Sequence, residues 1–177
     1  PLSSLAPLAI ALAVLALPAT ARAQDPAAAE SLFEAGRQLA EKGEWGPACE
    51  KFEASYRSDA TIGTALNLGE CSERQGKVGS ALSWFTVAKQ LCDARKNPRA
   101  DLAEERRAKL EPRAPHLLVR SKSQAKLEVR LDGERIDLDA VTSSDGHDHV
   151  VDPGDHVVEV LRGKEVVSTK KAHVDEA

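Results

Sequence analysis

Apolar side chains between residues 26 and 94 recur every three or four positions, the spacing of helices that bury one face. Glycine-centred breaks at Lys42-Gly43-Glu44 and Gln75-Gly76-Lys77 divide this stretch, and Pro47 suits the first turn of a helix. The pattern therefore predicts two helix–turn–helix units. Their apolar stripes comprise Leu32, Ala35, Gly36, Leu39 and Ala40, then Ala48, Cys49, Phe52, Ser55 and Tyr56, then Ala65, Leu68, Gly69 and Ser72, then Ala81, Leu82, Phe85, Ala88 and Leu91.

The two units repeat each other at an offset of 33 residues, the distance from Gly36 to Gly69. Repeats of this length are typical of stacked supersecondary units, so we predict units over about residues 29–61 and 62–94. A glycine in the first helix would let the second helix approach, and a phenylalanine would fill the space between hairpins. The coinciding pairs are Gly36 with Gly69, Gly43 with Gly76, Gly46 with Gly79, Ala48 with Ala81, and Phe52 with Phe85.

A capping helix is predicted over about residues 98–111, because two stacked units leave an apolar face that needs cover. Pro112 and Pro115 then end the helical pattern, so the helical domain is predicted over residues 24–112. The residues expected on the packed face of the capping helix are Leu102, Ala103, Arg106 and Leu110.

Residues 113–177 change to the alternating pattern of strands. Asp132-Gly133 and Arg162-Gly163-Lys164 each predict a hairpin turn. The chain is therefore predicted to be α+β with two domains, helical hairpins and a capping helix followed by a small antiparallel sheet or sandwich. The expected strands are His116–Arg120, Leu127–Leu131, His156–Leu161 and Glu165–Val167, with a further short one at Val150-Val151.

The chain begins with a segment that resembles an export signal. Residues 8–17 are uncharged and apolar, and Ala21-Arg22-Ala23 has the small residues that signal peptidase requires before its cut, here before Gln24. The run is shorter than a membrane-spanning helix needs, which favours a signal peptide over 1–23 rather than an anchor. We therefore expect an exported protein.

Charge and composition argue against two classes of function. The formal net charge is −4 at pH 7, so the basic surface expected of a nucleic-acid-binding protein is absent. The chain also contains no glycine-rich phosphate loop, no Gly-x-Ser-x-Gly and no His-Glu-x-x-His. We therefore expect no enzymatic activity, no small-molecule substrate and no cofactor.

Three cysteines stand at Cys49, Cys71 and Cys92. Cys49 is near the start of one predicted helix and Cys71 is near the end of the next, and antiparallel helices bring such positions together. A disulfide between them would stabilise the protein by about 2–4 kcal/mol in an oxidising compartment. The alternative is that both are buried free thiols. Cys92 has no evident partner.

Histidines and aspartates gather near the C-terminal strands. The histidines are His147, His149 and His156, and the first two could share one face of a strand. Residues 137–155 nevertheless match no zinc spacing or calcium loop. A solvated acidic loop is favoured over a metal site.

Two resemblances follow from these residues. Ala35-Gly36 with Ala48 and Phe52, and their counterparts in the second unit, resemble the tetratricopeptide repeat. Leu131-Asp132-Gly133, with Asp152-Pro153-Gly154-Asp155-His156 ahead of a valine-rich strand, resembles the PEGA family of small β-domains, here over residues 113–177. Such repeats and such a domain behind a signal peptide are similar to the layout of myxobacterial envelope proteins, which implies a periplasmic or envelope location.

The tetratricopeptide resemblance implies a scaffold that binds an extended protein or peptide segment with the first helix of each unit. The outward positions of those helices are Glu34, Arg37, Glu41, Asn67, Glu70 and Arg74. Asn67 can both donate to and accept from a peptide backbone. The alternatives are that these side chains are only solvated, as in an assembly spacer, or that the chain is an envelope sensor or regulatory subunit.

Overall fold

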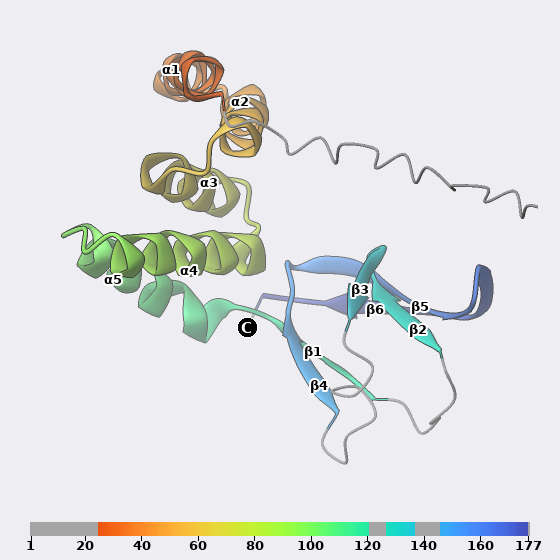
Figure 1. The fold of residues 1–177 in the computed structure, drawn as a ribbon. Coiled ribbons are helices and arrows are strands. Elements are labelled where there is room, and N and C mark those ends of the chain that lie inside the picture. The colour runs from red at the N-terminus through yellow and green to blue at the C-terminus, as the bar shows by residue number, and fades with distance from the viewer. Residues whose placement is uncertain (1–24, 121–126, 137–145, 177) are drawn as a thin grey trace, which may run out of the picture.

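The computed structural model describes residues 25–120, 127–136 and 146–176, and the predicted signal peptide lies outside them. The described chain is α+β, with helices first and strands after them, as the periodicity predicted (Figure 1). The helices stack in sequence order, and the β part lies beside the α4–η1 end of the stack. The helices are α1 Pro26–Glu41, α2 Trp45–Ser58, α3 Ile62–Arg74, α4 Val78–Ala94, α5 Ala100–Leu110 and the 3-10 turn η1 Glu111–Arg113.

Local chemistry sets where these helices begin and end. The side chain of Asp25 caps α1 by accepting a hydrogen bond from the backbone of Ala28, and Thr61 caps α3 in the same way. The breaks between paired helices contain Gly43 and Gly76, whose φ angles of 78° and 73° lie in the left-handed region that favours glycine.

The coinciding glycines and phenylalanines of the repeat make the same contact twice. A Cβ placed on Gly36 would lie 2.8 Å from the ring of Phe52, and one on Gly69 would lie 2.7 Å from the ring of Phe85. Both phenylalanines are fully buried. The 33-residue repeat therefore encodes a glycine notch that receives an aromatic ring within each helical hairpin.

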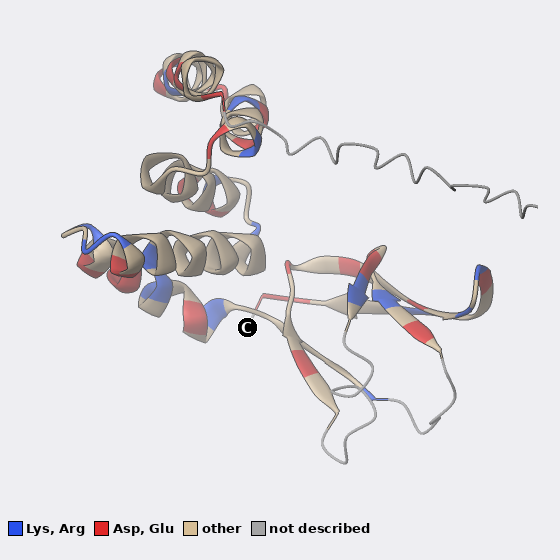
Figure 2. Cartoon of the chain, in the orientation of Figure 1, with Lys and Arg blue, Asp and Glu red and all other residues tan. Residues whose placement is uncertain are grey.

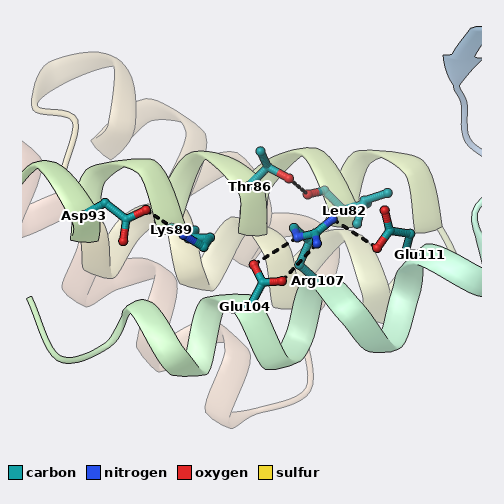
Figure 3. Close-up of polar contacts among 7 residues, drawn as sticks. All are labelled: Leu82, Thr86, Lys89, Asp93, Glu104, Arg107 and Glu111. Atoms are coloured by element: carbon teal, nitrogen blue, oxygen red, sulfur yellow. Dashed lines mark hydrogen bonds and ion pairs between the residues drawn. The ribbon is translucent and has the colours of Figure 1, made fainter.

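Helix α5 covers the end of the stack through Ala103 and Leu110, which are both buried. The prediction was wrong for Leu102, which is 46% exposed because its side chain lies on the open side of the helix. Acidic and basic residues both lie along α5 and η1 (Figure 2). Arg107 contacts Glu104 and Glu111, and Lys89 contacts Asp93 on α4 (Figure 3). Exposed pairs of this kind contribute little to stability.

The β part contains a two-stranded antiparallel sheet, β1–β4, and a four-stranded antiparallel sheet in the order β3-β2-β5-β6. The two predicted hairpin turns join β2 to β3 and β5 to β6. The predicted strand at Val150-Val151 is displaced, since β4 ends at Val150. The backbone N–H of Val151 donates to the carbonyl oxygen of Pro115 at 3.0 Å, and its own carbonyl lies against Gly79 of α4. The strands are β1 His116–Val119, β2 Glu128–Leu131, β3 Glu134–Ile136, β4 His147–Val150, β5 Gly154–Arg162 and β6 Glu165–Val174.

A disulfide joins Cys49 of α2 to Cys71 of α3, with a Cα–Cα distance of 5.7 Å. It links the second helix of one hairpin to the first helix of the next, where the antiparallel packing brings helix start and helix end together. Cys92 is a free thiol and is fully buried in α4.

No helix among the described residues combines the length and the apolar character needed to cross a membrane.

Candidate functional site

The first helix of each hairpin and the capping helix meet around Gly63. A Cβ on Gly63 would lie 3.8 Å from the ring of Phe33 on α1 and 3.8 Å from the guanidinium of Arg99, just before α5. The absence of a side chain at Gly63 thus leaves space between elements that are far apart in sequence. We call the surface around it the first-helix face, which comprises Phe33, Gly63, Asn67, Glu70, Arg99, Leu102 and Arg106.

Two hollows lie on this face. The larger, of about 480 Å³, runs from Phe33 past Gly63 to Arg95 and Arg99. The smaller, of about 90 Å³, lies between α3 and α5. It is lined by Leu66, Asn67, Glu70, Phe85, Leu102 and Arg106. The face therefore offers apolar and charged side chains side by side.

The larger hollow is lined by two arginines that form no ion pair among the described residues. Within the described residues, Arg95 and Arg99 pair with no carboxylate; Arg95 donates to the carbonyl oxygen of Ala60 and Arg99 to the amide oxygen of Asn97. The smaller hollow differs, because Arg106 there forms an ion pair of 2.7 Å with Glu73 and lies 4.9 Å from the ring centroid of Phe85.

Two of the six predicted groove residues, Asn67 and Glu70, line the smaller of these two hollows. Asn67 donates one amide hydrogen to the carbonyl of Gly63 at 2.9 Å, which leaves its oxygen and its second hydrogen available. Glu70 lies 3.4 Å from Arg74.

The other four predicted groove residues are exposed and lie outside the hollows. Arg37 contacts Glu34 and Glu41 on its own helix, at 3.7 and 3.3 Å. Arg74 stacks over the ring of Trp45 at 5.1 Å. The structure therefore does not bring Arg37, Asn67 and Arg74 together in one hollow.

The sequence prediction missed Phe33 and Arg99 as members of this face. Both could have been found by extending the repeat, because the same 33-residue offset carries Phe33 to Leu66 and Leu66 to Arg99.

A second polar arrangement joins the β part to the helices. Asp152 accepts hydrogen bonds from the backbone N–H and the hydroxyl of Ser80, at 2.7 and 2.6 Å. The carboxylate therefore lies in the first turn of α4, where free N–H groups and the positive end of the helix dipole stabilise an anion.

We call the contact of Asp152 with Ser80, together with the side chains that support it, the joint. One of these is His156, which is buried in β5. Its Nδ1 donates to the carboxylate of Asp132 at 2.6 Å, and its Nε2 donates to the carbonyl oxygen of Asp152 at 2.7 Å. Burial opposes a charge on His156, but these two acceptors outweigh it and raise the pKa of the imidazole. Burial likewise opposes ionisation of Asp132, but hydrogen bonds from His156 and from the N–H of Val157 lower its pKa overall.

A cavity of about 420 Å³ lies in this joint, between α4 and the β part. His149 lines it, and the Nε2 atom of His149 is buried with no hydrogen-bond partner among the described residues. Burial, followed by the nearby His147, lowers the pKa of His149, which keeps the ring neutral. The two rings touch edge to face at 4.3 Å between centroids.

The three histidines do not converge on a metal site. His156 is occupied by Asp132 and Asp152, and within the described ranges no group of three or more potential ligands could hold a metal ion. Residues 137–145 of the predicted acidic loop lie outside the described residues.

We predict that replacing Gly79 by Ala loosens the joint, because a Cβ there would lie 2.3 Å from the carbonyl oxygen of Val151. Overpacking of this kind costs about 1–3 kcal/mol. Hydrogen exchange of the Ser80 amide should report the loss. The control is Gly46→Ala, the same repeat position in α2, where a Cβ would meet nothing within 4 Å. Equal protection of Ser80 in both variants would contradict the prediction.

Comparison with models of known protein families finds none that matches this chain, and comparison with curated proteins finds no match either.

Proposed function

We propose that this protein is a non-enzymatic interaction module of the bacterial cell envelope, which binds an extended segment of a partner protein on the first-helix face. The observation that carries the proposal is the pair of hollows along α1, α3 and α5. Helical hairpins in a stack leave such a face open along the stack, and an extended chain can follow it from one unit to the next.

The side chains of the face suit a polypeptide. The exposed Leu102 and the half-buried Phe33 can contact apolar side chains of the partner. The amide oxygen and the second amide hydrogen of Asn67 can pair with a peptide bond. Arg95 and Arg99 form no ion pair among the described residues, so either can pair with an acidic side chain of the partner, although Glu30 and Asp59 also line that hollow. The tetratricopeptide resemblance supports the same mode of binding.

Location outside the cytoplasm is part of the proposal. It is supported by the signal-like sequence at residues 1–23 and by the Cys49–Cys71 disulfide, since such bonds persist in oxidising compartments. The PEGA resemblance of residues 113–177 supports an envelope contact through the β part.

The test is capture of partners from an envelope extract by immobilised protein, with recovery quantified by mass spectrometry. Asn67→Ala with Arg99→Ala should reduce recovery of a specific partner about tenfold or more, which corresponds to roughly 1.4 kcal/mol of binding free energy. The two changes remove the amide of Asn67 and the guanidinium of Arg99, which pairs with no carboxylate among the described residues, without changing a buried apolar residue.

The matched control is Arg57→Ala on α2, which removes an exposed arginine that forms an ion pair with Glu53 of its own helix, at 3.6 Å. This variant should recover the partner as the parent does. If the double variant recovers every partner equally well, the first-helix face is not the binding surface. The alternative, an assembly spacer without a ligand groove, would then be favoured; the contacts of Arg37 within α1 are consistent with it.

A further inference from the structure

The joint between α4 and the β part depends on a histidine that is held as a cation. Both ring nitrogens of His156 face oxygens that accept hydrogen bonds, the carboxylate of Asp132 and the carbonyl of Asp152, at 2.6 and 2.7 Å. A neutral imidazole has only one N–H, so it can satisfy only one of these oxygens. Because the pKa of Asp132 is lowered and its carboxylate is therefore an acceptor, the two contacts require a proton on each ring nitrogen of a residue that is 7% exposed.

His156 links the two anchors of the joint. Its Nδ1 contacts the carboxylate of Asp132, in the turn between β2 and β3. The same carboxylate accepts a hydrogen bond from the backbone N–H of Val157, at 2.8 Å. Through the carbonyl of Asp152, His156 orients the loop whose carboxylate binds the first turn of α4 at Ser80. The same loop lies directly against α4, where Gly79 contacts Val151.

We propose that this joint is a pH-dependent clasp, in which protonated His156 holds the β part against α4 and loss of its proton releases the loop from the helix. Deprotonation would remove one of the two donated hydrogens, so that a nitrogen lone pair would face an oxygen lone pair and that hydrogen bond would be lost. One of the two contacts would then open, either to the β2–β3 turn or to the loop that binds Ser80.

The other titratable and charged groups around the clasp do not explain a release of the loop from α4 as the pH rises. Those lining the adjoining cavity are Asp132, Asp152, Glu134, Arg135, His149 and His156 itself. His149 has a lowered pKa, so it loses its stabilising neutral form only as the pH falls. Asp132 also has a lowered pKa, and its contribution is lost only in acid.

The raised pKa of His156 has the opposite effect, because its contribution to stability is lost as the pH rises. Because the pKa of His156 is raised in the folded protein, its stabilisation is complete below the ordinary histidine pKa and is lost as the pH rises through the raised value. The clasp is therefore closed below the ordinary histidine pKa and weakens as the pH rises through the raised pKa of His156.

The test measures two quantities on the complete protein between about pH 5 and pH 9, a range that spans the histidine titration. Nitrogen chemical shifts of His156 report its protonation, and the protection factor of the Ser80 amide against hydrogen exchange reports closure of the joint. We expect the protection of Ser80 to fall as the pH rises from the ordinary histidine pKa to the midpoint at which His156 loses its proton in the folded protein. Within that interval it should fall by up to about tenfold for each pH unit, and above the midpoint it should level off.

His156→Gln should abolish this pH dependence, because the amide group of glutamine is uncharged and does not titrate in this range. The matched control is His173→Gln, which removes an exposed histidine whose pKa is raised by its hydrogen bond to Asp155, at 2.7 Å. That variant should keep the parent profile.

Two results would overturn the proposal. One is a neutral His156 ring at pH values below the ordinary histidine pKa, measured on the parent and therefore independent of how any variant folds. The other is constant Ser80 protection across the range while His156 titrates.

Discussion

Phe85→Ala is expected to lower the free energy of unfolding by about 3–5 kcal/mol, because it removes a fully buried ring and leaves a cavity. The ring occupies the notch at Gly69, where any Cβ would lie 2.7 Å from it. The measurement is equilibrium denaturation followed by far-ultraviolet circular dichroism, which reports the helices.

A double-mutant cycle with Gly69→Ala separates the energy of the contact between Gly69 and the Phe85 ring from the general loss of packing around that ring. Gly69→Ala alone should destabilise by about 1–3 kcal/mol, since the added methyl group collides with the ring. In the presence of Phe85→Ala the same methyl group has space, so its cost should vanish or change sign. Additive losses from the two substitutions would show that the glycine and the ring do not share one site.

Removal of the Cys49–Cys71 disulfide is expected to cost about 2–4 kcal/mol. The bond closes a loop with a sequence separation of 22 residues, so the reduced unfolded chain gains freedom that the oxidised chain lacks. The measurement is the denaturation midpoint of the parent with and without reductant.

The Cys49→Ala, Cys71→Ala variant supplies the control, because reductant should not change its midpoint. The thiol of Cys92, buried in α4, should remain unreactive toward thiol reagents until the protein unfolds. A parent midpoint that is insensitive to reductant would contradict the prediction.

The helices could be predicted from the sequence because their signals are local. Periodicity, the glycines at the breaks and the 33-residue offset each act over a few turns, and they placed the notch residues Gly36 and Gly69 correctly. The turn at Asp132-Gly133 was equally local, since both residues adopt the positive φ angles that its tight hairpin requires.

The joint between the two parts could not be predicted in the same way. Ser80 and Asp152 are 72 residues apart, and no periodic pattern connects them. The repeat makes Gly79 equivalent to Gly46, but in the structure Gly79 lies against the backbone of Val151, whereas a Cβ on Gly46 would meet nothing within 4 Å. On the first-helix face, individual outward positions could be identified, but their pairing within single helices depends on rotamers that the sequence does not specify.

The separation of Ser80 and Asp152 also has a consequence for the order of folding. Contacts within and between neighbouring hairpins close short loops, whereas the joint must close a long one, which costs more chain entropy and slows formation. The helical stack should therefore form early, and docking of the β part should be the final step. Until then the first turn of α4 has free N–H groups at Ser80, so its amide should be among the last to gain protection during refolding.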